Sequence, residues 1–166
     1  RVQRVGVVPT GEGPEADARA ARYAALREVA QAEGAPVLLG HTLDDQAETV
    51  LVNLLRGAAT SGLAAMRPGP QHPLLDLRRE ETVAVCATLG LRTVDDPSNR
   101  DPRHLRNRVR HELLPLMADL SQRDPVAVLA RQAGLAREDD DLLETLAAAL
   151  DPTDALGLAA APLALA

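Results

Sequence analysis

Residues 37–57, VLLGHTLDDQAETVLVNLLRG, hold the pattern that decides the expected fold. Residues 37–39 form a short apolar run closed by Gly40, which predicts a buried strand of a parallel sheet. Thr42 is suited to cap the helix that follows, and Asp45 supplies the carboxylate of a capping box. Apolar residues then recur at helical spacing until Gly57, namely Ala47, Val50, Leu51, Leu54 and Leu55. The stretch therefore predicts a strand followed by a helix.

Four polar side chains stand at the start of this predicted helix. Their spacing of i, i+3, i+4 and i+7 places them near one helical face: His41, Asp44, Asp45 and Glu48. Open α/β sheets bind ligands at the C-terminal ends of their strands, so the set is expected to be an active-site element. The alternative is that Asp44 and Asp45 only favour the helix N-terminus, which explains each residue alone better than the set of four.

Strands and helices are expected to alternate on both sides of this stretch. Residues 1–8 read as a strand and residues 15–33 as an amphipathic helix. Further elements are expected downstream: a helix at 78–89, a strand at 91–94, a helix from Asp101 to Pro115, and a helix from 124 to about 150. The predicted fold class is therefore α/β, part of an open parallel sheet flanked by helices, with a helical C-terminal portion.

A basic segment precedes the last of these helices. Between Arg100 and His111 there are five Arg and two His against one Asp. Leu105, Val109 and Leu113 form a buried stripe, which leaves most of the arginines outward. A charge run is usually a solvated face, but one so basic in an acidic chain is better explained as an anion site for phosphates. Arg19 and Arg22 lie together with Tyr23 on the earlier helix and permit the same two interpretations.

The composition limits the chemistry. All 18 basic residues are Arg, which excludes Schiff-base lysine chemistry and the lysine of a Walker loop within this sequence. The net charge of −6 argues against indiscriminate coating of nucleic acid. Cys86 is the single cysteine, so an internal disulfide is impossible, and this fits a reducing compartment. No membrane span or signal peptide is visible, and we expect a cytoplasmic protein.

Taken together, the motifs resemble the N-terminal domain of the tRNA(Ile)-lysidine synthetase family, within the N-type ATP pyrophosphatase (PP-loop) superfamily. The resemblance covers roughly residues 1–150. It rests on stretches that keep their order and approximate spacing: EADARAARYAAL at 15–26, LLGHTLDDQAETVLVNLLRG at 38–57, TSGLAAM at 60–66, HPLL at 72–75, DDPSNRD at 95–101 and RNRVRHELLP at 106–115. The combination is specific, whereas each motif alone is weak.

The resemblance implies a fold and a reaction. The fold is the adenine nucleotide alpha hydrolase-like sheet of PP-loop ATPases. The enzyme uses ATP to adenylate C2 of the wobble cytidine in tRNA(Ile) with a CAU anticodon, releasing pyrophosphate. The amino group of L-lysine then displaces AMP to form lysidine. ATP and Mg²⁺ are the implied cofactors, and a homodimer is compatible with the resemblance.

The resemblance also implies site residues. Positions that match the catalytic cleft are Arg19, Arg22, His41, Asp45 and Glu48. Positions that match substrate contacts are Asp44, Arg106, Asn107, Arg108 and Arg110. Asp45 and Glu48 are candidate metal ligands, although either could instead hold the ammonium groups of lysine.

Two departures from the family qualify these expectations. The SGGxDS phosphate loop is absent from the sequence, and His72 stands where Arg usually precedes Pro-Leu-Leu. Because the sequence starts at Arg1, we expect a fragment whose upstream part carries that loop, and we expect the fragment alone to be inactive. Its parts would be a partial catalytic domain at 1–120, a helical extension at 121–150 and a linker at 151–166 leading into a further domain.

Two other functions remain open from the sequence. One is another PP-loop enzyme of tRNA modification, such as a thiolase of cytidine, although such enzymes usually bring more cysteines than Cys86 alone. The other is a non-catalytic helical module whose acidic face binds a metal or a partner.

Overall fold

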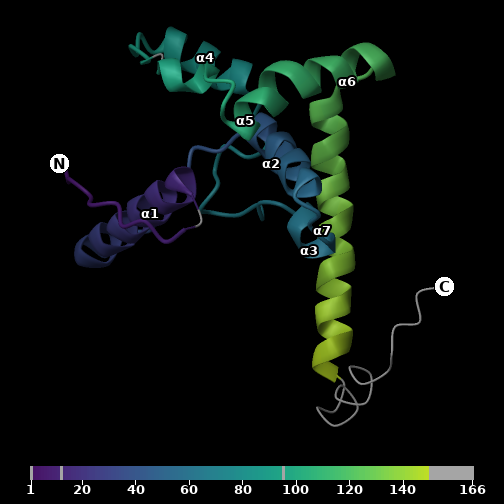
Figure 1. Ribbon diagram of the computed structural model, residues 1–166, viewed down its shortest axis with the longest axis horizontal. Coiled ribbons are helices and arrows are strands. Elements are labelled where there is room, and N and C mark those ends of the chain that lie inside the picture. The colour runs from purple at the N-terminus through teal and green to yellow at the C-terminus, as the bar shows by residue number, and fades with distance from the viewer. Residues whose placement is uncertain (1, 12, 95, 150–166) are drawn as a thin grey trace. The chain divides into compact units, whose positions relative to one another are not determined.

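The computed structural model describes residues 2–11, 13–94 and 96–149, and every regular element within them is helical (Figure 1). The elements are α1 (Pro14–Glu33), α2 (Leu43–Leu55), α3 (Thr60–Leu63), α4 (Arg79–Thr88), the 3₁₀ turn η1 (Pro97–Arg100), α5 (Leu105–Arg108), the π-helical turn η2 (Val109–Leu113), α6 (Leu114–Ser121) and α7 (Pro125–Ala149). The expected linker at 151–166 lies outside the described residues.

The predicted α/β fold class is wrong for the part of the chain that the structure describes. Residues 2–8, 37–39 and 91–94, which were expected to be strands, form no ladder there. A strand needs a neighbour to pair its backbone N–H and C=O groups. Leu39 N donates one backbone hydrogen bond, to Gln71 O at 2.8 Å, which is a loop contact. The apolar run at 37–39 therefore had the composition of a buried strand without a neighbouring strand among the described residues.

The described residues divide into two compact units, each considered by itself. The first contains the residues up to Gly40 together with Pro68–Pro73. Its helix α1 ends at Gly34, which adopts the left-handed conformation with φ 62°, as a helix C-terminus favours. Thr10 Oγ1 donates to Asp17 Oδ1 at 2.6 Å and ties the preceding turn to α1. The helix was predicted correctly, but its expected apolar face is half-buried or exposed.

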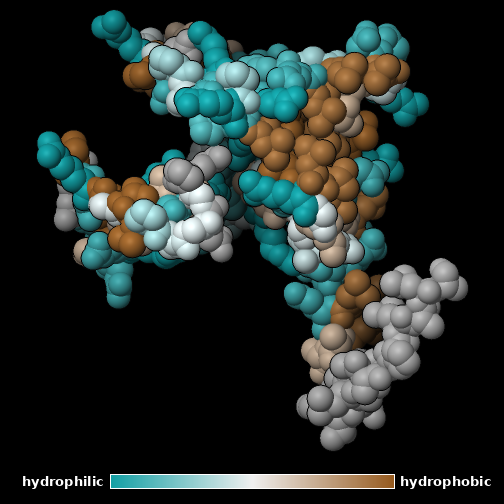
Figure 2. All heavy atoms as spheres, viewed as in Figure 1, coloured by the Kyte–Doolittle hydropathy of each residue, from teal (hydrophilic) through white to brown (hydrophobic). Residues whose placement is uncertain are grey.

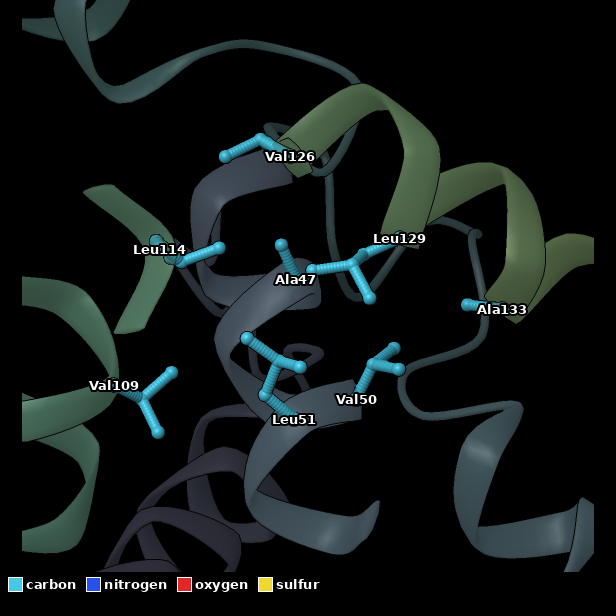
Figure 3. Close-up of a cluster of buried hydrophobic side chains, with 8 residues drawn as sticks. All are labelled: Ala47, Val50, Leu51, Val109, Leu114, Val126, Leu129 and Ala133. Atoms are coloured by element: carbon cyan, nitrogen blue, oxygen red, sulfur yellow. The ribbon is translucent and has the colours of Figure 1, made fainter. Parts of the chain in front are cut away.

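The second unit contains His41–Arg67 and the described residues from Leu74 onward. Within the described ranges, every buried hydrophobic residue belongs to it. Helix α7 packs along α2 and α3, as Figure 1 shows. Ala47, Val50 and Leu51 of α2 lie between residues of η2 and α6 on one side and residues of α7 on the other (Figure 3). The surrounding residues are Val109, Leu114, Val126, Leu129 and Ala133. The core is therefore aliphatic, as the near-absence of aromatic residues requires.

The helix that was expected to end at Pro115 continues through it as α6. Proline cannot donate the helical hydrogen bond, and its ring crowds the carbonyl four residues earlier. The preceding turn, Val109–Leu113, is π-helical and so wider than an α-turn, which gives the ring room. The helix predicted from 124 to about 150 is present as α7, which runs through Gly134 to Ala149 without interruption.

An exposed hydrophobic area extends over α6 and the adjoining part of α7 (Figure 2). Exposed large hydrophobic residues of these two helices include Leu116, Leu120, Val128 and Leu135. Among the described helices, none combines the length and the apolar character that crossing a membrane requires.

Candidate functional site

The start of α2 is held by the capping box that the sequence predicted. Thr42 N donates to Asp45 Oδ2 at 2.9 Å, and Asp45 N donates to Thr42 Oγ1 at 3.4 Å. Thr42 itself is buried. The reciprocal bonds satisfy backbone donors of the first turn and fix the direction in which the helix leaves the loop. They thereby set the positions of the three carboxylates of this turn and the next.

Glu48 is the most enclosed of these carboxylates, because its side chain is 0% exposed and three arginines bind it. Arg110 donates from Nε to Oε1 at 2.7 Å and from Nη2 to Oε2 at 2.9 Å. Arg106 donates from Nε to Oε2 at 2.8 Å. Arg79 approaches Oε1 with Nη1 and Nη2, each at 3.3 Å. A buried carboxylate requires such partners, because burying it unpaired would be strongly unfavourable.

Asp45 lies beside Glu48 and shares the same three arginines. Its Oδ1 is 2.9 Å from Arg79 Nη2, 3.2 Å from Arg106 Nη2 and 3.5 Å from Arg110 Nη2. Burial on its own raises the pKa of the Asp45 carboxyl. The hydrogen bonds from Thr42 and the positive charges of Arg79 and Arg106 outweigh that effect, so the pKa lies below its ordinary value. Asp45 is therefore a carboxylate at neutral pH.

Asp44 is engaged by the start of α4. Arg78 contacts its two oxygens from Nε and Nη2 at 3.3 Å each, and the backbone N of Arg79 donates to Oδ2 at 2.7 Å. Arg78 also pairs with Asp124. Burial works to lower the pKa of Arg78, and its contacts with Asp44 and Asp124 raise it above the ordinary value. We call the seven residues the arginine–carboxylate cluster: Asp44, Asp45, Glu48, Arg78, Arg79, Arg106 and Arg110.

Arg106 and Arg110 are four positions apart and share an inward face, whereas Arg108 points elsewhere. Both of the former reach Glu48, whereas Arg108 donates to Glu112 Oε2 at 2.9 Å on the outside. Burial lowers the pKa of Arg110, but its bonds to Glu48 raise it above the ordinary value. The two arginines that face inward therefore neutralise a carboxylate instead of extending from the surface.

The other predicted substrate residue, Asn107, holds a loop. Its Nδ2 donates to Ser98 O at 2.8 Å and to Asp101 O at 2.9 Å. His111 Nε2 lies 3.1 Å from Asn99 O. The DPSNRD segment is thus fastened along the element that carries the inward arginines.

The remaining predicted residues lie as follows. His41 is half-buried and comes directly before the capping residue Thr42. Arg19 and Arg22 belong to the unit that contains α1, where both guanidinium groups lie over the ring of Tyr23, at 4.9 and 5.7 Å from its centroid. Arg19 Nη2 also donates to the Tyr23 hydroxyl at 3.3 Å.

Arg78 and Arg79 were missed by the sequence interpretation. They follow the HPLL motif in LDLRRE and precede a predicted helix, so the signal was a pair of arginines at a helix start. Their partners are more than thirty positions away, for example 31 positions between Arg79 and Glu48. A local pattern could not reveal this pairing.

In the cluster, guanidinium N–H groups are more available to a ligand than carboxylate oxygens are to a metal ion. No group of three or more His, Cys, Asp or Glu able to hold a metal ion occurs within the described ranges. The oxygens of Asp45 and Glu48, the candidate metal ligands, are occupied by arginine. A divalent cation there would have to displace a guanidinium group.

Comparison with known proteins accounts for this combination of motifs. The PP-loop domain family matches residues 1–117, a range that contains every residue of the arginine–carboxylate cluster. The chain belongs to the PP-loop domain family. Every regular element that the structure describes in this PP-loop chain is helical.

The PP-loop chain is similar to several curated relatives called tRNA(Ile)-lysidine synthase. The relative from Cutibacterium acnes is 47% identical over 150 residues, which are 88% of this chain and 48% of the relative. The relative from Mycolicibacterium paratuberculosis is 51% identical over 149 residues, 87% of this chain and 46% of the relative. The relative from Thermobifida fusca is 45% identical over an alignment of 177 positions, which covers 99% of this chain and 55% of the relative. The chain thus spans about half the length of these relatives.

Proposed function

We propose that the protein acts as a tRNA(Ile)-lysidine synthase, a carbon–nitrogen ligase of tRNA modification. The observation that carries the proposal is the 47% identity, over 88% of this chain, to a relative of that name. The family match includes the whole arginine–carboxylate cluster, so the similarity extends to the most highly charged part of the chain.

The proposed reaction has two steps. The C2 oxygen of the wobble cytidine in tRNA(Ile) with a CAU anticodon attacks the α-phosphorus of ATP, and pyrophosphate leaves. The amine of L-lysine then attacks C2, loses a proton, and AMP leaves with the oxygen. The first step brings two polyanions together and the second adds a cationic substrate, so the site needs guanidinium groups for the phosphates and carboxylates for the ammonium groups. The cluster contains both types of group.

We assign the roles accordingly. Asp45 and Glu48 are the groups for a cationic substrate, with Asp44 beside them. Arg106 and Arg110 bind substrate phosphate. Asn107 holds the adjoining loop, and Arg108 forms an ion pair on the surface beside it. His41, Arg19 and Arg22 complete the catalytic set by their match to the family motifs. Support for the first five comes from their contacts or adjacency at the start of α2.

The proposal extends to the metal ion, the cellular compartment, the oligomeric state and the domain organisation. Mg²⁺ accompanies ATP, and Asp45 and Glu48 would hold either that cation, after displacing a guanidinium group, or the ammonium groups of lysine. The enzyme works in the cytoplasm, where its tRNA substrate is found, and a homodimer is part of the proposal. Residues 1–120 contribute the catalytic domain, residues 121–150 a helical extension and residues 151–166 the linker.

The test is AMP formation by the full-length polypeptide that carries this sequence. We expect AMP release that requires tRNA(Ile) transcript and L-lysine together, with lysidine detected in the digested tRNA by mass spectrometry. The matched control is the same transcript with uridine at the wobble position. AMP formed without any requirement for lysine would support another PP-loop tRNA-modifying enzyme. A polypeptide without response to ATP and tRNA would support the non-catalytic module.

A further inference from the structure

We propose that Arg79, Arg106 and Arg110 form one binding site for a phosphate chain, assembled around Glu48, with Arg79 as a substrate-binding residue. The identity of the natural anion rests on the proposed function, whereas the existence of the site does not. The chemical class is a small phosphate anion with several oxygens, such as pyrophosphate.

The three arginines come from separate segments and converge on one carboxylate. Arg79 begins α4, Arg106 lies in α5 and Arg110 in η2, and all three contact Glu48 of α2. Figure 1 shows α5 beside the start of α2. Glu48 fixes the direction of each guanidinium plane, and such preorganisation lowers the cost of ordering long side chains when a ligand binds.

The guanidinium groups keep donors for a ligand. Arg79 uses Nη1 and Nη2 on the carboxylates, and Arg106 and Arg110 use Nε and Nη2. Nε of Arg79 and Nη1 of Arg106 and Arg110 have no hydrogen-bond partner among the described residues. The side chains are 35%, 30% and 23% exposed respectively, so a solute can approach them. An arginine has five N–H donors in a planar fork, which suits phosphate oxygens.

Directed donors, and not a surplus of charge, favour an anion at this site. Arg79, Arg106 and Arg110 share Asp45 and Glu48, so three positive charges meet two negative ones. Asp44 also acts on Arg110, and Arg78 pairs with both Asp44 and Asp124, so the surrounding four arginines and four carboxylates balance. A phosphate would therefore be held by the N–H groups that the carboxylates leave open.

The experiment measures binding of inorganic pyrophosphate to the full chain by isothermal titration. We expect Arg79→Gln to weaken pyrophosphate binding by about tenfold or more, the effect of losing a charge-assisted contact. Arg67→Gln is the matched control, because it removes the same charge from an exposed arginine that pairs with Asp141. It should change the affinity by less than about twofold, since an exposed charge is screened by salt. Equal affinity for the wild type and Arg79→Gln, or no binding to the wild type, would overturn the proposal.

A second variant covers the case in which Arg79→Gln does not fold. Arg79→Lys keeps the charge but loses the fork, so its affinity should lie between those of the wild type and the glutamine variant. Pyrophosphate should also raise the melting temperature of the wild type more than that of Arg79→Lys. Equal melting shifts would contradict the site.

Two sources of phosphate are distinguished by further arms of the experiment. If the site serves nucleotide phosphates, Arg79→Gln weakens ATP binding to the full-length polypeptide and leaves the salt dependence of tRNA binding unchanged. If it serves the tRNA backbone, the same variant lowers that salt dependence by about one unit of slope and leaves ATP binding unchanged. Lysidine formation is measured separately, so its absence alongside intact pyrophosphate binding would refute the proposed function and leave the anion site standing.

Discussion

Glu48 shows how a single carboxylate can hold distant segments together. Three arginines meet on it, and the carboxylate is fully buried while the guanidinium groups remain partly in water. Because the carboxylate is buried and the guanidinium groups are partly exposed, removing the carboxylate would chiefly affect the three arginines. Their charges would remain near the core without a full counter-charge.

We therefore expect Glu48→Gln to lower the free energy of unfolding by on the order of 2–3 kcal/mol, less than for a wholly buried pair because water reaches the arginines. Urea unfolding followed by circular dichroism measures the change. Glu138→Gln, on the exposed face of α7, is the control and should have little effect. A loss for Glu48→Gln no larger than for the control would show that the arginines are satisfied without it.

Asp45 makes the stability depend on pH. Its pKa lies below the ordinary 3.8 in the folded chain, so the folded state binds its proton more weakly than the unfolded state. The stabilisation is fully present above pH 3.8 and is lost as the pH falls through the lower folded pKa. We expect the difference in unfolding free energy between the wild type and Asp45→Asn to be constant from neutral pH to the unfolded pKa and to shrink below it. A difference that stays constant under strongly acidic conditions would contradict this assignment.

At the scale of elements, the segment α5–η2–α6 carries two different tasks. Its inward face supplies Arg106 and Arg110 to the carboxylates, and its other side fastens the DPSNRD turn through Asn107. The π-helical turn contains both the inward Arg110 and the core residue Val109, so the charged and the packed parts of the segment meet within it. The position of the inward arginines is therefore coupled to that of η1.

Asn107→Ala is expected to release this turn. The variant removes both bonds from Nδ2 and leaves the carbonyls of Ser98 and Asp101 to water. We expect faster hydrogen–deuterium exchange in Pro97–Arg100 and a loss of about 1 kcal/mol in unfolding free energy, because the site is partly exposed. Gln132→Ala on the exposed side of α7 is the control. Unchanged exchange in η1 would show that other contacts hold it.

The elements also show what a sequence can and cannot predict. The Thr42–Asp45 capping box and the ends of α1 and α4 at Gly34 and Gly90 were predictable, because each depends on residues within one turn. The pairing of Glu48 with Arg106 was not predictable, because the two residues lie 58 positions apart in the sequence. Continuation of the helix through Pro115 was missed because the accommodating π-turn has no sequence signature of its own. The sheet failed as a prediction because an apolar run indicates burial and says nothing about a pairing partner.

On the scale of the whole molecule, stability is distributed unevenly between the two units. Every buried hydrophobic residue that the structure describes belongs to the second unit, where α2 packs on α7. Helix α1 contributes none of them among the described residues. Most helical stability in proteins comes from packing of an apolar face, so a helix without buried apolar residues is expected to open more readily than one that packs in the core.

We therefore expect backbone amides of α1 to exchange with deuterium faster than those of α2 and of the N-terminal half of α7. Mass spectrometry of peptides from Pro14–Glu33 and Leu43–Leu55 makes the comparison within one sample. Equal protection of both helices would mean that α1 is covered by contacts that these residues do not include.

The placement of the single aromatic side chain has an optical consequence. Tyr23 is the one tyrosine of a sequence without Phe or Trp, and it lies under the guanidinium groups of Arg19 and Arg22 on α1. Intrinsic tyrosine fluorescence of this chain therefore reports on α1 alone. The unit that contains Glu48 contributes no aromatic fluorescence. A melting curve recorded by fluorescence would follow the less protected helix, while circular dichroism would follow all of them. The two curves together would resolve the units without any introduced label.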